Sequence, residues 1–424
     1  MRVALTVAAW VLIVLLGLWA VHLGDPHLLP IRRFETLGLA ALAAISVGVT
    51  LRMRPGVDRT LRLGALCFIV AVASTQALVS RYQRAAVLKA SLPGLNGLGS
   101  RFVVGYANVE DLKPLIAKGL IAGIYVSGRN VRGRSAQHIR DEIHELQALR
   151  RASGLPALIV ATDQEGGLVS RLSPPLPEMP PLASLPGESD TIAEIESRAE
   201  AYAERQGRDL ARLGINVNFS PVVDLLPAGP DNPLDFHSRI KQRAISADPQ
   251  LTARVALAYA RGLEKHGVRA TLKHFPGLGR VKTDTHHFSA TLETPVAELE
   301  AHDWVAFKDV ARRSNALIML SHVVLEDVDD VNPVSFSRKS ISSVIRGSWK
   351  HDGILITDDL TMGAAYGRGL CTATVKALNA GVDLLLISYD YDKYYESMYC
   401  AAQALEQGRL THRRFDRSAP TQTR

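Results

Sequence analysis

The sequence predicts an α/β fold: a (β/α)8 barrel of the TIM type, preceded by about three transmembrane helices. Two observations support this prediction. Three apolar runs bounded by arginines occupy the first 80 of the 424 residues, whereas short β-rich runs alternate with longer amphipathic ones after residue 97. Eight of these short runs occur, which is the number of parallel strands that closes a barrel covered by helices.

The first 80 residues are expected to form a membrane anchor. Residues 3–22 contain no Asp, Glu, Lys or Arg, and about 20 apolar residues suffice for a helix to cross a bilayer. Further runs follow at 37–51 and 63–80. A signal peptide is an alternative for the first run, but it has no clear small-x-small cleavage site. Buried core helices are disfavoured because the three runs cluster without polar faces.

The arginines that flank these runs predict the orientation in the membrane. Three spans place the two chain ends on opposite sides. The densest basic cluster lies between the second and third runs, and the positive-inside rule puts it in the cytoplasm. We therefore expect a multi-pass protein of the cell membrane with its C-terminal domain outside the cytoplasm. The cluster consists of Arg52, Arg54, Arg59 and Arg62.

The net charge of +7 partly reflects these flanking arginines, which suit the anionic headgroups of a lipid bilayer. No basic stripe with interleaved aromatic residues occurs, so nucleic acid is not an expected partner. The three cysteines show no metal-ligand or redox spacing. Cys371 and Cys400 could form a disulfide, and the sequence leaves that open.

The barrel is predicted over residues 98–418, after a linker at 81–97 and before a disordered tail at 419–424. The linker ends in Pro and Gly, which favour turns. Amphipathic helices at 195–214 and 248–267 each end at glycine. An open doubly wound sheet is the alternative, weakened because no glycine-rich phosphate loop follows the first strand. Strands are predicted at 101–106, 123–128, 157–163, 216–224, 270–275, 316–323, 353–359 and 383–389.

Polar and ionisable residues gather where successive strands end. In a barrel these carboxyl ends face the catalytic mouth, and a purely structural barrel has no reason for such a bias. Carboxylates at this mouth, without a metal-ligand pattern, suggest hydrolysis of an acetal or ester. The residues include Asp163, Asp224, Lys273, His274, His322, Asp358 and Asp359.

Sugar chemistry suits this set of side chains. A carboxylate such as Asp358 can attack an anomeric carbon, while a second group protonates the leaving oxygen. Asp284 and His286, two residues apart in one loop, can form a pair in which the carboxylate orients the imidazole. The adjacent His287 leaves a second histidine for this role, and Asp359 is alternatively a helix N-cap.

Five motifs in a fixed order resemble glycoside hydrolase family 3, and most closely its single-barrel β-N-acetylglucosaminidase branch, which serves bacterial peptidoglycan recycling. The resemblance extends from Leu98 to Ser418. It implies a retaining exo-β-N-acetylglucosaminidase, a β-N-acetylhexosaminidase whose substrates are peptidoglycan-derived glycans and which needs no cofactor or metal. The motifs are ATDQEGGLVSRL (161–172), INVNFSPVVDL (215–225), LKHFPGLGR (272–280), DTH (284–286) and ILITDDLTM (354–362).

The resemblance also implies roles for individual residues. Asp358 matches the nucleophile, with Asp359 as a supporting neighbour, and His286 with Asp284 matches an acid/base dyad on a flexible loop. The matching substrate-binding residues are Asp163, Arg171, Arg243, Lys273 and His274.

Two other functions stay open. One is a β-glucosidase-like enzyme of the same family, against which the dyad argues because other branches use a carboxylate from a second domain. The other is a catalytically silent, membrane-tethered glycan-binding protein, which has no need of a dyad. Whether water or phosphate accepts the glycosyl group, and the oligomeric state, are also left open.

Overall fold

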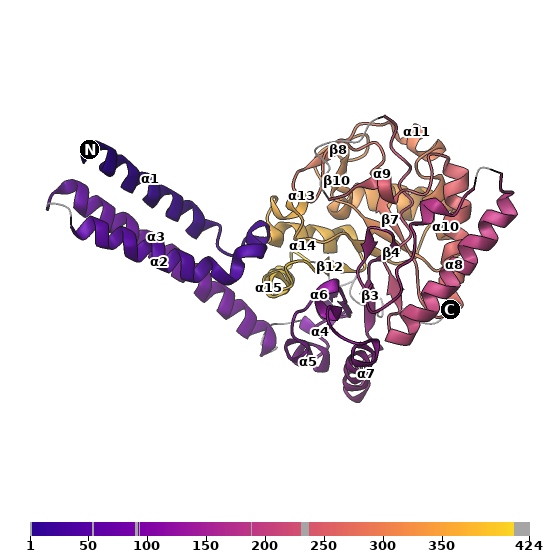
Figure 1. The fold of residues 1–424 in the computed structure, drawn as a ribbon, viewed down its shortest axis with the longest axis horizontal. Coiled ribbons are helices and arrows are strands. Elements are labelled where there is room, and N and C mark those ends of the chain that lie inside the picture. Colours follow the sequence, from indigo (N-terminus) through magenta and orange to yellow (C-terminus); the bar gives the residue numbers. More distant parts are fainter. Residues whose placement is uncertain are drawn as a thin grey trace. The chain divides into compact units, whose positions relative to one another are not determined.

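The structure is a computed structural model, shown in Figure 1. It describes residues 2–52, 55–89, 92, 94–187, 189–229 and 237–410. Two compact units make up the chain: the N-terminal unit, Met1–Lys89, and the C-terminal unit, Ala90–Arg424. Arg54 of the predicted cytoplasmic cluster, residues 411–418 of the predicted barrel and the tail expected at 419–424 lie outside the described residues.

The N-terminal unit is a group of helices that pack along one another (Figure 1). Apolar side chains from all three long helices form its interior, among them Leu16, Leu39 and Leu66. The helices are α1 (Arg2–Val21), the short 3-10 helix η1 (Pro26–Ile31), α2 (Arg32–Leu51) and α3 (Val57–Leu88).

One described helix, α3, is long and apolar enough to cross a membrane. Among the residues whose side chains the structure describes, the other apolar helical stretches, Thr6–Val21 and Leu37–Leu51, have 10–17 residues each, whereas about 20 are needed. The prediction of three spans is therefore not supported: only the expected run at 63–80 lies in a qualifying helix. This helix also continues to Leu88, so the first part of the predicted linker is helical.

Eight parallel strands follow one another round a ring in the described part of the C-terminal unit. One sheet has the order β12-β1-β2-β3-β6 and another the order β11-β9-β7. Parallel bridges at Val217–Arg269, Val222–Lys273 and Ile356–Leu384 join the edges of the two sheets. The strands are β1 (Phe102–Val104), β2 (Gly123–Tyr125), β3 (Ile159–Thr162), β6 (Val217–Asn218), β7 (Thr271–Phe275), β9 (Leu317–Leu320), β11 (Leu355–Thr357) and β12 (Leu385–Ile387).

Every predicted strand overlaps one strand of this ring, and helices alternate with them as expected. Thr191 and Glu194 form a capping box at the start of α8, and Asp248 caps α10, whose first residue is Pro249. These two helices correspond to the predicted segments 195–214 and 248–267. The covering helices are α5 (Val109–Ala117), α7 (Ala136–Ala152), α8 (Ile192–Leu213), α10 (Pro249–Glu264), α12 (Val305–Arg313), the π-helix η4 (Ser340–Ser348), α14 (Leu370–Ala380) and α15 (Lys393–Glu406).

Shorter elements fill the loops between these strands and helices. The disulfide Cys371–Cys400 joins α14 to α15, with 5.4 Å between the two Cα atoms. The short elements are α4 (Leu95–Gly99), α6 (Gly128–Val131), β4 (Gln164–Gly166), β5 (Val169–Ser170), η2 (Leu182–Ser184), α9 (Ile240–Arg243), β8 (Ala290–Leu292), α11 (Val296–Ala301), β10 (Val323–Leu325), η3 (Val334–Phe336) and α13 (Gly363–Tyr366).

Apolar side chains from the strands fill the barrel core, including Val103, Phe219, Met319, Ile356 and Leu386. The packing is tight enough to require glycine in β2. A Cβ added to Gly123 would lie 2.4 Å from the carbonyl oxygen of Ile159 and 2.5 Å from its Cβ. Backbone in a closed barrel cannot move away from such a contact without disturbing its neighbours.

We expect Gly123→Ala to lower the free energy of unfolding by about 1–3 kcal/mol, because the added methyl overpacks the barrel wall. Gly97→Ala is the matched control, since nothing lies within 4 Å of its added Cβ, and it should cause no loss. Denaturant unfolding of the detergent-solubilised chain measures both values. Equal stability of the two variants would contradict the close strand packing.

Candidate active site

The site lies at the carboxyl ends of the barrel strands. The described structure brings to these ends all eight residues that were predicted as catalytic or substrate-binding. Asp163 follows β3, Lys273 and His274 belong to β7, and Asp358 follows β11. The loop after β7 carries Asp284 and His286, and Arg243 ends the short helix α9. The C-terminal ends of parallel strands meet at one rim, which explains why residues so far apart in sequence converge.

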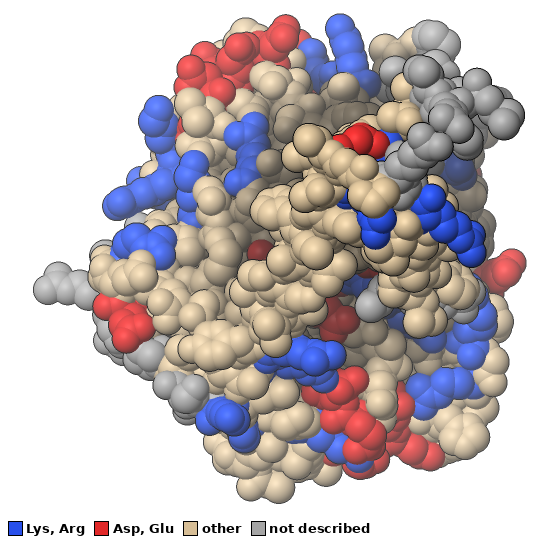
Figure 2. Space-filling view, turned by 90° about the vertical axis from the view of Figure 1, so that its left-hand side faces the viewer, with Lys and Arg blue, Asp and Glu red and all other residues tan. Residues whose placement is uncertain are grey.

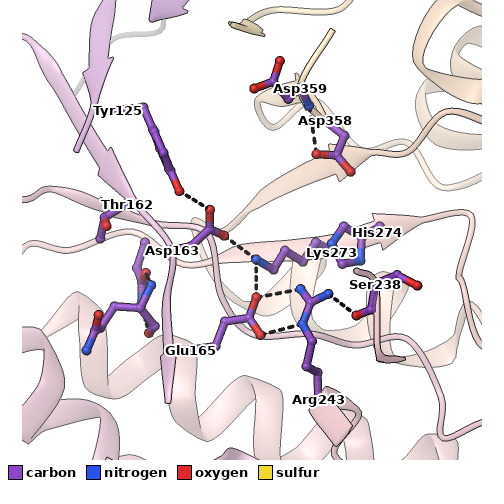
Figure 3. A network of polar contacts seen from close by, with 12 residues as sticks. Tyr125, Thr162, Asp163, Glu165, Ser238, Arg243, Lys273, His274, Asp358 and Asp359 are labelled. Carbon is purple, nitrogen blue, oxygen red and sulfur yellow. Dashed lines mark hydrogen bonds and ion pairs between the residues drawn. The ribbon is translucent and has the colours of Figure 1, made fainter. Parts of the chain in front are cut away.

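A chain of charges crosses the floor of the site, as Figure 3 shows. The Lys273 ammonium lies 2.5 Å from Asp163 Oδ1 and 2.6 Å from Glu165 Oε1. Arg243 binds Glu165 through two nitrogens, at 2.9 and 2.7 Å, and donates to the Ser238 carbonyl at 2.7 Å. Glu165 therefore links two cations, and it was not predicted as a site residue although it lies in the same motif as Asp163.

The charges of this network balance one another. Burial alone would raise the pKa of Glu165, but Arg243 and Lys273 lower it to about 2. Glu165 in turn raises the pKa of Arg243 against the effect of burial. Glu165 and Arg243 are thus both ionised at neutral pH.

The hydroxyl of Tyr125 donates to Asp163 Oδ2 at 2.7 Å. Burial and the charge of Asp163 raise the pKa of Tyr125 well above its ordinary value, while the charge of Arg171 opposes the shift. The backbone N–H of Arg171 also donates to the Asp163 carbonyl at 3.0 Å. Arg171 and Tyr125 therefore belong to the same side of the site as Asp163.

Asp224 fixes the orientation of His274. Its Oδ2 lies 2.7 Å from Nδ1 of the imidazole, and its Oδ1 accepts the backbone N–H groups of His274 and Leu278 at 3.0 and 2.8 Å. The side chain of Asp224 is completely buried. With its proton on Nδ1, the imidazole donates a hydrogen bond to the Asp224 carboxylate, and its Nε2 lies on the side of the ring away from that carboxylate.

The two adjacent aspartates after β11 have different surroundings. Asp359 accepts hydrogen bonds from the backbone and hydroxyl of Thr361, from the backbone and hydroxyl of Ser388, and from the backbone of Tyr389, at 2.6–2.9 Å. It thereby ties the end of β11 to the end of β12. The carboxylate of Asp358 instead accepts the backbone N–H of Asp359 at 2.8 Å, and Figure 3 shows it facing the Asp163–Lys273 side of the site.

The histidines around Asp358 favour its ionised form. Burial would raise the pKa of Asp358, but His274, His322, His286 and the Asp359 N–H together hold it below the ordinary value. His322 is itself buried, which lowers its pKa, and its nitrogens contact the Ser335 hydroxyl at 2.8 Å and the Asp359 carbonyl at 2.9 Å. His322 and Asp224 stood at predicted strand ends without a predicted role.

Asp284 and His286 form a hydrogen-bonded pair. His286 Nδ1 lies 2.8 Å from Asp284 Oδ1, which also accepts the His286 backbone N–H at 3.0 Å. Burial opposes ionisation of Asp284, but the hydrogen bonds and charge of His286 and the His237 N–H lower its pKa well below the ordinary value. The side chain of His286 is 38% exposed and that of Asp284 is 0% exposed. A buried carboxylate thus holds an imidazole that faces solvent.

The structure distinguishes His286 from its neighbour His287. The ring of His287 contacts His237 Nδ1 at 3.1 Å through Nε2, whereas His286 directly contacts the carboxylate. The backbone of the loop is also fixed near Asp358, because the N–H of Gly363 donates to the His286 carbonyl at 2.8 Å. His286 is therefore the histidine whose ring directly contacts the Asp284 carboxylate.

Exposed apolar side chains gather on the loops around this site. Five of the six large exposed apolar residues in the described part of the C-terminal unit lie in loops that follow a barrel strand. Figure 2, a view turned by 90° from Figure 1, shows Lys and Arg side chains spread over that face and Asp and Glu side chains in a few separate groups. The five residues are Leu168, Leu226, Phe288, Val331 and Tyr389.

Comparison with known proteins gives the family of this chain. The model of the glycosyl hydrolase family 3 N terminal domain matches residues 96–422. A β-hexosaminidase of Xanthomonas oryzae pv. oryzae is 33% identical over 271 residues, which are 63% of this chain and 77% of that protein. A β-hexosaminidase of Nitrosomonas eutropha is 30% identical over 324 residues, covering 74% and 87%.

Solved structures show the same relationship. A glycoside hydrolase family 3 β-N-acetylglucosaminidase from Paenibacillus sp. str. FPU-7 is 30% identical with a TM-score of 0.69, and the match covers 77% of this chain and 60% of that chain. A β-N-acetylhexosaminidase from Beutenbergia cavernae is 26% identical with a TM-score of 0.68, covering 77% and 96%. The expectation of a glycoside hydrolase is thus confirmed, and the chain belongs to glycosyl hydrolase family 3.

Proposed function

We propose that this protein is a retaining exo-β-N-acetylglucosaminidase that removes terminal N-acetylglucosamine from peptidoglycan-derived fragments. The observation that carries the proposal is the His286–Asp284 pair beside Asp358. The relatives support the sugar, because those with matching sequence and fold are described as β-hexosaminidases or β-N-acetylglucosaminidases. A glycan-binding protein without activity would not require an ionised carboxylate and an imidazole held ready for proton transfer.

The first step forms a bond between Asp358 and the sugar. The carboxylate attacks the anomeric carbon as the glycosidic bond breaks, and protonated His286 gives its proton to the leaving oxygen. Asp358 is suited to attack because its pKa is lowered and its carboxylate is less occupied by hydrogen bonds than that of Asp359. The negative charge of Asp284 stabilises the imidazolium before the transfer.

The second step releases the sugar. Neutral His286 removes a proton from water, and the resulting oxygen attacks the anomeric carbon and expels the Asp358 carboxylate. A phosphate acceptor is compatible with the same geometry, since an imidazole repels an anion less than a carboxylate acid/base would. Net retention follows from two successive displacements at one carbon.

The charge network on the floor of the site is proposed to bind the sugar hydroxyls. Asp163 can accept hydrogen bonds from two adjacent hydroxyls, while Lys273 and Arg171 can donate them. His274, oriented by Asp224, presents its other nitrogen as a further partner. Arg243 is engaged by Glu165 and Ser238, so it contributes by positioning Glu165 and Lys273 in addition to any remaining N–H it offers to substrate.

We propose that α3 anchors the chain in the cell membrane with the C-terminal unit outside the cytoplasm. A single span, like three, leaves the two ends of the chain on opposite sides, so the arginines before α3 and at its start still favour a cytoplasmic N-terminal side. The Cys371–Cys400 disulfide favours an oxidising compartment.

Asp358→Ala should lower kcat on an aryl β-N-acetylglucosaminide by at least about 10³-fold, because it removes the nucleophile. Wild-type protein should hydrolyse this substrate in preference to the matching aryl β-glucoside. Asp358→Asn serves as an isosteric control and should be similarly slow. Turnover of neither sugar by folded wild-type protein would favour the glycan-binding alternative, and preference for the glucoside would favour the β-glucosidase alternative.

His286→Ala should slow hydrolysis by about 10²–10⁴-fold for a substrate with a poor leaving group, since the leaving oxygen then needs a proton. Bond cleavage with a 2,4-dinitrophenyl leaving group, which departs without protonation, should be slowed much less. Pre-steady-state release of the two leaving groups measures the difference. His287→Ala is the neighbouring control and should retain the wild-type rates; an equal loss in that variant would contradict the assignment of His286.

Glu165→Gln should lower the free energy of unfolding at pH 7 by about 3 kcal/mol, because it leaves Lys273 and Arg243 buried with too little negative charge. The pKa of Glu165 falls from the ordinary 4.5 to about 2 on folding. Its contribution to stability is therefore complete above pH 4.5 and is lost as the pH falls towards 2. The stability difference between variant and wild type should shrink over this range in denaturant titrations, and a difference independent of pH would contradict the ion-pair account.

A further inference from the structure

A backbone turn joins Asp358 and His286, the two residues that the proposed mechanism uses. It begins at Asp359, whose carbonyl accepts the backbone N–H of Met362 at 3.0 Å. Asp358 immediately precedes this turn. Gly363 immediately follows it and donates its N–H to the His286 carbonyl at 2.8 Å. The position of the turn therefore affects both residues.

Two of the described side chains attach this turn to neighbouring strands. The Asp359 carboxylate accepts the backbone N–H groups of Ser388 and Tyr389, at the end of β12. On the other side, His322 follows β9 and places its Nε2 at 2.9 Å from the Asp359 carbonyl oxygen. The imidazole of His322 thus ties the turn to the end of β9.

The partners of His322 determine which of its nitrogens carries the proton. A carbonyl oxygen only accepts hydrogen bonds, so Nε2 is the donor to Asp359. Nδ1 lies 2.8 Å from the Ser335 hydroxyl, which can donate to an unprotonated nitrogen. Burial lowers the pKa of His322, with a smaller contribution from His286, while the charges of the two aspartates oppose the shift. The ring is therefore neutral, with its proton on Nε2.

The other two imidazoles near Asp358 are held differently. Asp224 and Asp284 each place a carboxylate oxygen within 2.8 Å of an Nδ1 of these rings, and an adjacent anion favours the protonated form. In the described part of the chain, a hydroxyl and a carbonyl are the hydrogen-bond partners of His322. His322 can therefore hold the turn without forming an ion pair that would restrain the nucleophile.

We propose that His322 is a positioning residue: as a neutral imidazole between Ser335 and the Asp359 carbonyl, it fixes the turn that holds Asp358 and the His286 loop together. It acts through Asp359 and not on the substrate. Its effect on rate rests on the proposed function, whereas its protonation state and contacts do not.

His322→Leu should lower kcat on the aryl β-N-acetylglucosaminide about 10–100-fold, because the turn loses its attachment to β9 and small displacements of reacting groups are costly. Binding of N-acetylglucosamine, measured by isothermal titration calorimetry, should stay within about twofold, since the charge network on the floor of the site is unchanged. His322→Gln should recover most of the rate, because its neutral amide supplies both a donor and an acceptor. His351→Leu is the matched control and should keep the wild-type kcat, since His351 is a partly buried histidine at the opposite end of β11.

The leaving group separates this role from a loss of proton transfer. Cleavage of the 2,4-dinitrophenyl substrate needs no acid, so His286→Ala should affect it little, whereas His322→Leu should slow it at least about tenfold. Ser335→Ala, a smaller change, should lower kcat about threefold to tenfold because it releases Nδ1. Wild-type kcat in both the His322→Leu and Ser335→Ala variants would overturn the proposal. So would a loss of N-acetylglucosamine binding as large as the loss of kcat, which indicates general disruption of the site.

The protonation state is measured independently of turnover by ¹⁵N NMR of the full chain in detergent, labelled at histidine, with His322→Gln identifying the signals. We expect one protonated and one unprotonated ring nitrogen at pH 7, and a shifted Nδ1 signal in Ser335→Ala. Two protonated nitrogens would overturn the neutral role. If folded wild-type protein cleaves neither sugar, the proposed function fails, while the NMR signals still decide the contacts of His322.

Discussion

The buried ion pairs of Lys273 are the constraint on which the rest of the site depends. An ammonium group that is 2% exposed is costly unless anions compensate it, and here Asp163 and Glu165 do so from the loop that follows β3. Arg243 then compensates the additional carboxylate. These groups come from the loop after β3, from β7 and from the segment between β6 and β7, and these three strands are neighbours in the ring. The ion pairs therefore link the loops at the carboxyl ends of adjacent strands.

The aspartates of the site show how surroundings give one residue type different roles. Asp224 and Asp359 are saturated by hydrogen bonds and hold backbone segments together. Asp163 is paired with a cation and a phenol hydroxyl. Asp358 keeps an accessible carboxylate whose charge is favoured by nearby imidazoles. Asp358 thus differs from Asp359, whose carboxylate is held by hydrogen bonds from Thr361, Ser388 and Tyr389.

Local sequence patterns were sufficient to predict the strands and the polar residues at their carboxyl ends, and the reason is physical. Buried parallel strands require continuous apolar runs, and functional residues collect at their carboxyl ends, so Asp358 and Lys273 could be placed before the structure was known. Glu165 and Asp224 acquire their roles from partners distant in sequence, which local patterns do not reveal. The number of membrane spans does not follow from apolar composition alone, since one described helix, α3, is long and apolar enough to cross a membrane.

Main-chain atoms connect the loop that carries Asp284 and His286 to the segment that follows Asp358. Gly363 and Ala364 donate their N–H groups to the carbonyls of His286 and Thr285. Every amino acid supplies the carbonyl, and every amino acid except proline supplies the N–H donor, so a rim side chain such as Phe288 can change without breaking these main-chain hydrogen bonds. The barrel thereby keeps one chemistry while its rim can be adapted to different glycans.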